Sequence, residues 1–410
     1  MTEYEEIKTK VQNRLFEKLQ YSMETEDAQV REMIWEEILS EGKSSYIPHG
    51  KKEKLCNEIY YAIRKLDVLQ ELIEDNSITE IMVNGPNCIF VEKGGGLIRY
   101  KNRFSSTEKL EDIIQQIVAG SNRVVNESSP IVDARLENGS RVNVVLAPVA
   151  LNGPILTIRR FPDKPIGVED LLRMGAVTEE VVRFLEKLVI AGYNIFISGG
   201  TGSGKTTFLN VLSGFIPKTE RIITIEDSAE LQIQGIENLV RLETRNANME
   251  DCKPITIRDL IKTSLRMRPD RIIVGEVRSV EAIDMVQALN TGHDGSLSTG
   301  HANSARDMLY RLETMILMGM EMPLSAVRRQ IAGGIDVIVH LGRLRDKSRK
   351  VMEIAEVLGY EDGEIVTAPI YRFEESGTGR DGKIIGELKK RGSLKHLDKL
   401  LAAGFSAEEI

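Results

Sequence analysis

The sequence predicts an α/β fold with a mostly parallel sheet, preceded by a smaller α+β domain and an N-terminal helical bundle. Strongly apolar runs such as NIFIS, ERIITIE and RIIVGE alternate with apolar patterns of helical period, which favours parallel strands covered on both faces. A glycine-rich loop joins one of these strands to a helix. The length of 410 residues exceeds what one hydrophobic core usually supports, so we expect two to four domains.

Composition and charge limit the classes of function. Hydrophobic residues make up 41% of the chain and charged residues 28%, as in globular proteins. The 54 basic and 62 acidic residues give a net charge of −8, which disfavours duplex nucleic-acid binding except through a local basic patch. Cys56, Cys88 and Cys252 are too widely spaced for a disulfide framework or a zinc ribbon. The start, MTEYEEIKTK, is charged and no long apolar run follows, so we expect a cytoplasmic protein without a membrane span.

Residues 1–70 are rich in Glu, Lys, Leu and Ile and contain little glycine. Val11, Leu15, Phe16 and Leu19 fall on one helical stripe, which predicts an N-terminal helical extension. We expect these helices to form a small bundle.

Residues 71–160 show a different pattern. Two β-rich runs in ITEIMVNGPNCIFVEK precede a helix, and IVDARLENGSRVNVVLAP with LTIRRF adds further strands. Ser105 and Glu108 have the spacing of a capping box at the start of that helix. Its apolar face is predicted to contain Leu110, Ile113, Ile114, Ile117 and Val118. This order of elements indicates a compact α+β domain.

The proline-containing stretch FPDKPIGVEDLL marks a linker, which we place at residues 161–168. Residues 169–375 then form the main α/β domain, and its last third, from DVIVHL onwards, reads as a β-rich meander. The methionines of MILMGMEM, residues 315–322, are interpreted as core filler under a helix. Residues 376–410 are assigned as a charged C-terminal tail.

The glycine-rich loop matches GxxxxGKT from Gly199 to Thr206. Glycines let the backbone N–H groups approach a phosphate, Lys205 supplies a point charge, and the Thr206 hydroxyl can bind Mg²⁺. The strand before the loop and the helix after it are the context that this motif requires, whereas an ordinary glycine turn would not need them. We therefore expect ATP and Mg²⁺ at the following residues: Gly199, Gly200, Thr201, Gly202, Ser203, Gly204, Lys205, Thr206 and Thr207.

Acidic residues follow two of the apolar strands. Glu226, Asp227 and Glu230 follow one strand and Glu276 follows another, at the edge where open α/β sheets place their ligand crevice. Phosphate-loop enzymes usually carry an aspartate at the end of the second of these strands. It is absent here, so Glu276 would bind the metal in its place. A solvated strand end is the alternative for either group alone, and two such groups after a phosphate loop favour a catalytic site.

The stretch TGHDGSLSTGHANS contains His293 and His301. Their spacing matches no common zinc ligand pair, and each could simply cap or pack, but a histidine among Ser, Thr and Gly could also sense a γ-phosphate. Arg241 and Arg245 are four residues apart, and an arginine supplied across a subunit boundary can stabilise transition-state charge. Taken alone, surface ion pairs are the simpler interpretation of these arginines.

The segments GGTGSGKTT, TIEDSAEL, RPDRIIVGEVR and TGHDGSLSTGHANS occur in this order. Their order and wording resemble the secretion ATPases of the type II/type IV secretion superfamily, which carry a Walker A loop, an aspartate box, an atypical Walker B and a histidine box. DARLENGSRV, GPILTIRRF and the helical extension look most like the tight-adherence (Flp) pilus assembly branch. The resemblance covers about residues 70 to 375 and implies a RecA-like P-loop core.

The resemblance implies a role for each motif residue. Lys205 and Thr206 would bind phosphate and Mg²⁺, with Glu276 near the metal and Asp227 in support. Glu230 matches the residue that activates water.

His301 matches the phosphate-sensing histidine, and Arg241 and Arg245 match arginines that act between subunits. The family forms hexameric rings in the cytoplasm, docked peripherally on a polytopic inner-membrane platform protein. The resemblance therefore implies an ATP hydrolase that powers pilus assembly, retraction or protein secretion, with no stable nucleic-acid partner.

A DNA-directed motor with a related core is the main alternative, and it predicts stimulation by single-stranded DNA. A small-molecule kinase would act as a monomer, and a catalytically inactive scaffold would lack intact Lys205, Glu230 or Glu276.

Overall fold

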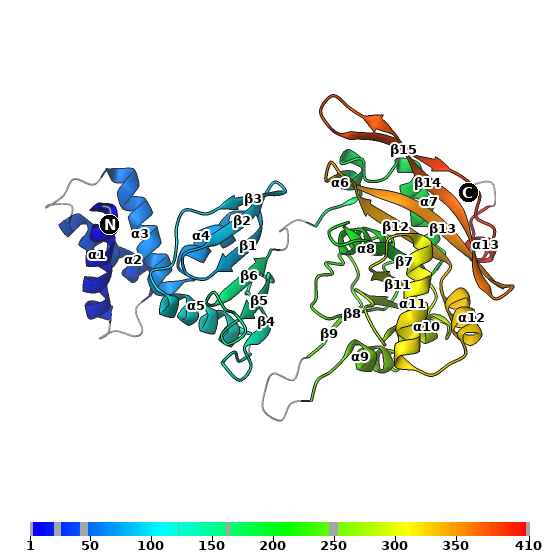
Figure 1. The fold of residues 1–410 in the computed structure, drawn as a ribbon, viewed down its shortest axis with the longest axis horizontal. Coiled ribbons are helices and arrows are strands. Elements are labelled where there is room, and N and C mark those ends of the chain that lie inside the picture. The colour runs from blue at the N-terminus through cyan, green and yellow to red at the C-terminus, as the bar shows by residue number, and fades with distance from the viewer. Residues whose placement is uncertain are drawn as a thin grey trace. The chain divides into compact units, whose positions relative to one another are not determined.

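The computed structural model describes residues 3–19, 26–41, 48–121, 123–160, 165–245 and 253–406 (Figure 1). Cys252, residues 161–164 of the expected linker, and the side chains of Phe16 and Leu19 lie outside the described part. The chain forms two compact units, one within residues 1–163 and one within residues 164–247 and 251–410. In the part that the structure describes, no helix is both long and apolar enough to cross a membrane.

The N-terminal unit begins with a helical bundle. Its helices are α1 (Glu3–Leu19), α2 (Asp27–Glu41) and α3 (His49–Arg64). The shorter α4 (Val68–Glu74) follows them and packs in the core of the sheet described next. Val11 and Leu15 of the predicted stripe are fully buried in the bundle core, together with Ile34 and Ile38 of α2.

The rest of this unit is a sheet with one long helix. The sheet order is β3-β2-β1-β6-β5-β4, and every neighbouring pair is antiparallel. The elements are β1 (Ile78–Asn84), β2 (Ile89–Lys93), β3 (Gly96–Arg99), α5 (Thr107–Gly120), β4 (Ile131–Arg135), β5 (Arg141–Val145) and β6 (Ile155–Arg159). All five apolar residues predicted for the face of α5 are buried in the same core as the strands.

The cap of α5 differs from the predicted one by one residue. Ser106, not Ser105, is the N-cap, because its extended backbone lets its hydroxyl accept the N–H of Lys109 at 3.2 Å. The predicted capping box of Ser105 and Glu108 is therefore wrong in register.

The second unit contains a nine-stranded sheet in the order β15-β14-β13-β12-β7-β11-β10-β8-β9. The strands from β12 to β9 are parallel to their neighbours, and β12 to β15 form an antiparallel meander. The strands are β7 (Ile195–Gly199), β8 (Ile222–Glu226), β9 (Leu239–Glu243), β10 (Arg271–Val274), β11 (Leu297–Gly300), β12 (Val337–Arg343), β13 (Arg349–Glu361), β14 (Glu364–Thr378) and β15 (Ile384–Lys390). This is the mostly parallel sheet with a β-rich end that the sequence predicts.

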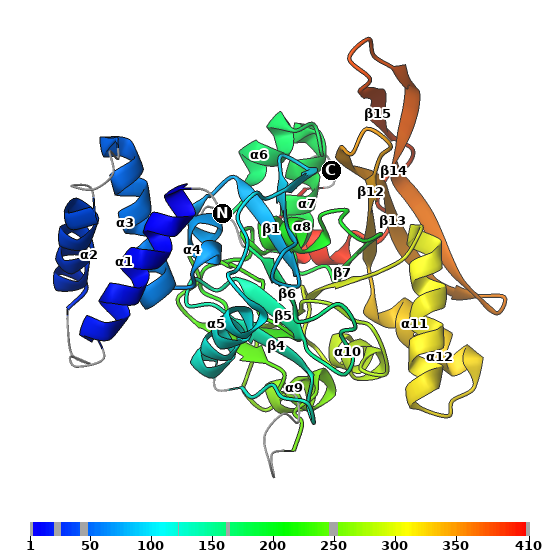
Figure 2. The ribbon, with the colours of Figure 1, turned by 60° about the vertical axis from the view of Figure 1, so that its left-hand side comes forward.

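Helices cover both faces of this sheet. Neighbouring residues of a strand point to opposite faces, so Ile195 and Ile197 join one core and Phe196 joins the other. The first core includes residues of α6 (Val168–Arg173), α7 (Glu179–Ile190), α8 (Lys205–Ser213) and α13 (Asp398–Ala402). The second includes α9 (Ile257–Ser264), α10 (Ala282–Leu289), α11 (Ala305–Gly319) and α12 (Leu324–Gly334), with α11 and α12 side by side (Figure 2).

Two regions differ from the sequence-based picture. The boundary expected after residue 375 falls inside β14, and β15 and α13 are built into the sheet and its core. The backbone N–H groups of Lys395 and His396 donate to the buried carboxylate of Glu356 at 2.8 and 2.7 Å, which ties this segment to β13. Of the methionines expected as core filler, Met315 is buried, but Met318 is 68% exposed because it lies on the outer face of the last turn of α11.

Candidate nucleotide site

The phosphate loop connects the carboxyl end of β7 to the amino end of α8. A Cβ atom on Gly199 would lie 2.5 Å from the carbonyl oxygen of Leu341, so no side chain fits there. Gly202 and Gly204 have φ values of +70° and +93°, which L side chains rarely adopt. Packing or backbone conformation therefore requires three of the four predicted loop glycines, whereas a Cβ atom on Gly200 would meet no atom within 4 Å.

Lys205 is the buried cation of this loop, and its side chain folds back over it. Its Nζ donates to the carbonyl oxygens of Gly199 and Gly200, each at 3.1 Å, and contacts Nδ1 of His301 at 3.2 Å. His301 directly follows β11, which is the neighbour of β7 in the sheet. The parallel arrangement thus brings two predicted residues, 96 positions apart, into contact.

Glu276 and Asp227 extend this contact into a line of charged groups. Nε2 of His301 lies 2.7 Å from Oε1 of Glu276, and the guanidinium of Arg278 donates to the other oxygen of Glu276 at 2.6 Å. Arg278 also lies 3.6 Å from the carboxylate of Asp227. The sequence interpretation gave Arg278 no role, although its position two residues after Glu276 could have suggested one.

His301 lies between a cation and an anion, and the direction of its pKa shift shows which influence is stronger. Burial and the charge of Lys205 lower the pKa of His301, and the opposing effect of Glu276 does not reverse this. The imidazole is therefore neutral near neutral pH. If Nδ1 accepts from Lys205, the single ring proton is on Nε2, facing Glu276.

Glu230 is held in place by a residue for which the sequence suggested no separate role. Glu226, at the end of β8, is 3% exposed, and its Oε1 accepts the backbone N–H groups of Glu230 and Leu231 at 2.7 and 2.9 Å. Burial raises the pKa of Glu226 to about 7. The segment that contains Glu230 is also attached to α8, because the backbone N–H of Gln232 donates to the side-chain oxygen of Asn210 at 2.9 Å.

Arg241 and Arg245 lie apart from the cluster around Lys205. Arg241, on β9, donates to the carbonyl oxygen of Leu231 at 2.9 Å. Arg245 donates to the carbonyl oxygen of Lys253 at 3.2 Å, and its backbone pairs with Ile255. Both residues are exposed on the surface of the second unit.

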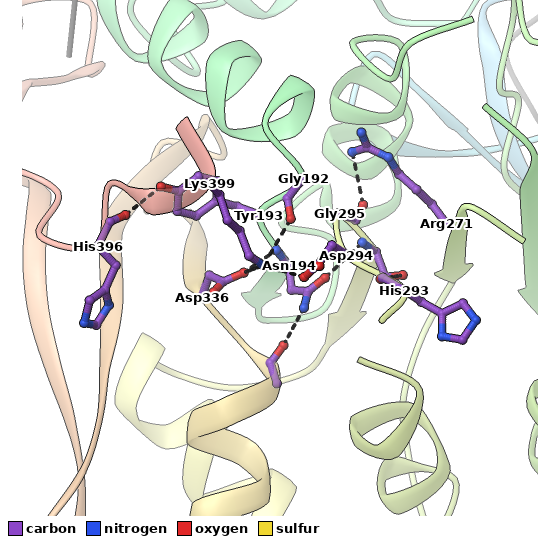
Figure 3. A network of polar contacts seen from close by, with 12 residues as sticks. Gly192, Tyr193, Asn194, Arg271, His293, Asp294, Gly295, Asp336, His396 and Lys399 are labelled. Carbon is purple, nitrogen blue, oxygen red and sulfur yellow. Dashed lines mark hydrogen bonds and ion pairs between the residues drawn. The ribbon is translucent and has the colours of Figure 1, made fainter. Parts of the chain in front are cut away.

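His293 precedes β11 and His301 follows it, so the two histidines lie at opposite edges of the sheet. Figure 3 shows the surroundings of His293. Nδ1 of His293 is 3.2 Å from the carbonyl oxygen of Ala288. The adjacent Asp294 accepts from Nζ of Lys399 at 2.7 Å. The structure thus divides the motif TGHDGSLSTGHANS between two edges and places His293 in a structural network.

The network around Lys399 attaches the last helix to this edge. Lys399 donates to Asp336 at 2.7 Å and to the carbonyl oxygen of Gly192 at 3.2 Å. The hydroxyl of Tyr193 donates to the carbonyl oxygen of His396 at 2.6 Å (Figure 3). Burial opposes the charge of Lys399, but Asp336 and Asp294 raise its pKa.

The donor set at the loop fits a metal that enters with a nucleotide. Among the described residues, no group of three or more His, Cys, Asp or Glu side chains could hold a metal ion. The hydroxyl-bearing Thr206 is half-buried at the start of α8, and the carboxylates of Glu276 and Asp227 are at the same edge of the sheet. Such a sparse set of oxygen ligands suits Mg²⁺, which usually completes its shell with water and phosphate oxygens.

Comparison with known proteins gives a consistent family. The model for "Type II/IV secretion system protein" matches residues 63–377. The chain is 32% identical to a putative conjugal transfer protein of Mycobacterium tuberculosis, over 80% of this chain and 94% of that protein. It is also 32% identical to the type IV secretion system protein PtlH of Bordetella pertussis, over 73% of this chain and 94% of PtlH.

Solved structures share the fold. The ATPase DotB of Legionella pneumophila has a TM-score of 0.52 at 22% identity, covering 72% of this chain and 80% of DotB. The pilus retraction motor PilT with bound ADP has a TM-score of 0.51 at 18% identity, covering 84% of this chain and 98% of PilT. With the family model matching most of its length, this chain belongs to the type II/IV secretion system protein family, as its motifs indicate.

Proposed function

We propose that this protein is a Mg²⁺-dependent ATPase that forms a hexameric ring and drives pilus assembly, pilus retraction or protein secretion. The observation that carries the proposal is the line from Lys205 through His301 to Glu276 at the phosphate loop. Family membership supports a secretion motor, and the tight-adherence branch stays a prediction from the sequence.

The residues around the loop divide the proposed reaction between them. Lys205 and the loop N–H groups would bind the phosphates, and Thr206, Glu276 and Asp227 would hold Mg²⁺. The bound Mg²⁺ would neutralise phosphate charge. Glu230 orients and activates the attacking water. The hydrogen bonds from the backbone N–H groups of Glu230 and Leu231 to Glu226 fix the backbone at this position.

His301 is proposed to report the γ-phosphate. A phosphate oxygen would compete with Nδ1 of His301 for a proton on Nζ of Lys205, so nucleotide state would change the contact between His301 and Glu276. Arg241 and Arg245 are exposed, which suits arginines that act on the site of a neighbouring subunit.

The partner proposed for the ring is a polytopic platform protein of the inner membrane, with the motor peripheral to the cytoplasmic face. The names of relatives such as PtlH place them in secretion systems, which supports a partner of this kind.

The test is ATP hydrolysis against protein concentration, with the mass of each species measured in the same samples. We expect specific activity to rise with a species of about six subunits, and Glu230→Gln to bind MgATP but lose hydrolysis. Full activity in a monomer would contradict the ring, and wild-type turnover by Glu230→Gln would remove Glu230 from the mechanism.

A DNA-directed motor is the second candidate, because several relatives are named as conjugal transfer proteins. One of them, TrbB of Rhizobium radiobacter, is 31% identical over 76% of this chain and 95% of TrbB. The net charge of −8 disfavours this candidate. Stimulation of ATP hydrolysis by single-stranded DNA would favour it, and an unchanged rate would dismiss it.

A further inference from the structure

Two arginines approach the phosphate loop from the side opposite to His301. In the sheet, β7 lies between β11 and β12, and both neighbours are parallel to it. The carboxyl ends of all three strands therefore meet at one edge. His301 follows β11 on one side of the loop, and Arg343 ends β12 on the other.

Arg349, at the start of β13, is the direct cross-strand partner of Arg343. Side chains of directly opposed residues lie on the same face of an antiparallel pair. Both reach Gly202: Nε of Arg349 donates to its carbonyl oxygen at 2.8 Å, and a guanidinium nitrogen of Arg343 lies 3.5 Å from the position of a Cβ there.

The charge of these two residues is not balanced within the described chain. Neither forms an ion pair with a carboxylate in the residues that the structure describes, and the side chain of Arg343 also has no hydrogen bond there. In the same hairpin, Arg345 is paired with both oxygens of Glu375. Like charges directly opposite one another are destabilising, so an anion between Arg343 and Arg349 would relieve a repulsion that the fold leaves in place.

We propose that Arg343 and Arg349 bind the polyphosphate chain of the nucleotide. They form a cationic group on one side of the phosphate loop, and Lys205 and His301 lie on the other side. This inference rests on the proposed ATPase function and adds two phosphate-binding residues to it. Guanidinium groups suit the task, because their planar donors match phosphate oxygens. Arg349 in addition positions the loop through its bond to Gly202.

The test uses the full chain and two probes, MgATP and inorganic tripolyphosphate, with dissociation constants measured by calorimetry. Arg343→Gln is the primary variant, because Arg343 forms no described hydrogen bond whose loss would disturb the loop. We expect it to weaken tripolyphosphate and ATP about tenfold, the effect of one charge-assisted hydrogen bond, and Arg343→Lys to recover part of the loss. The double variant with Arg343→Gln and Arg349→Gln should bind MgATP and tripolyphosphate about a hundredfold more weakly than wild type.

Arg345→Gln is the matched control, since it removes one positive charge from the same hairpin at a residue already paired with Glu375. It should bind both probes as wild type does. Wild-type affinity for tripolyphosphate in Arg343→Gln would overturn the inference. If Arg349→Gln lowers the melting temperature but binds tripolyphosphate normally, Arg349 only stabilises the loop. That result would also overturn its proposed role in phosphate binding. If the wild-type chain binds neither probe, the proposed ATPase function itself fails.

Discussion

The two edges of the nine-stranded sheet differ in how completely their charges are paired. At the edge where the strands begin, Lys399 forms ion pairs with Asp294 and Asp336, and Arg271 forms one with Glu220. At the edge where they end, Arg278 pairs with Glu276 and Asp227. Neither Arg343 nor Arg349 forms an ion pair with a carboxylate in the part of the chain that the structure describes. Cations without an acidic partner suit an anionic ligand, which supports the proposed phosphate site at that edge.

The strand β11 shows the contrast at short range. It has four residues, all buried, and one end leads to His301 while the other follows His293 and Asp294. One continuous sequence motif therefore reaches both edges, and only the residues after the strand belong to the proposed nucleotide site.

The largest effect expected at the nucleotide edge comes from Lys205→Ala. It removes the buried cation of the loop, so we expect nucleotide binding to be lost, with the dissociation constant for MgATP raised more than about a hundredfold. Lys399→Met is the control from the opposite edge, and it should lower stability while leaving the affinity for MgATP unchanged. Equal losses of affinity in the two variants, measured by calorimetry, would break the distinction between the edges.

A second variant tests the structural edge. Arg271 is 2% exposed, pairs with Glu220, and donates to the carbonyl oxygens of Val189 and Gly295. Arg271→Met leaves these acceptors without a donor, and we expect the free energy of unfolding in urea to fall by about 3 to 5 kcal/mol.

The matched control is Arg173→Met, which breaks an exposed ion pair with Asp170 and should cost less than about 1 kcal/mol. A cost as small for Arg271→Met would show that this edge does not depend on its matched charges.

The third prediction concerns the pH dependence that Glu226 introduces. Its ordinary pKa is 4.5, and burial raises it to about 7 in the folded protein. Between these values the folded state holds a proton that the unfolded chain has released, so stability falls as pH rises through this window, by roughly 3 kcal/mol in all. Glu226→Gln is neutral throughout and keeps an oxygen for the N–H groups of Glu230 and Leu231.

Urea unfolding at pH values from 5 to 8 checks this directly. The variant should be as stable as wild type at the acidic end and more stable at pH 8. Glu179→Gln, at an exposed position of α7, serves as the control and should follow the wild-type curve. Parallel curves for Glu226→Gln and wild type would show that Glu226 is ionised throughout.

The sequence predicts much of the second unit because its signals are local. The phosphate loop and the strands that end in acidic residues depend on residues close together in the chain, as does the apolar face of α5 in the first unit. The pairing of Arg343 with the loop could not be predicted in this way. It requires β12 to lie beside β7, although four other strands separate them in sequence.

The role of Lys399 was missed for a similar reason. Nothing near residue 399 indicates that it will reach Asp294 and Asp336, which come from two distant loops. Side-chain exposure at helix ends, as at Met318, also depends on how the last turn meets its neighbours rather than on composition.

The position of β15 as the edge strand beside β14 has a practical consequence for shortened forms of the protein. Cutting the chain after residue 375 would remove β15 and leave the backbone donors and acceptors of β14 open to solvent along one side. Open strands of this kind recruit other chains, so the truncated protein should precipitate or enter inclusion bodies during expression. The same cut would remove the backbone N–H groups that donate hydrogen bonds to the buried carboxylate of Glu356. For purification, an affinity tag placed after residue 406 is therefore safer than a shortened chain.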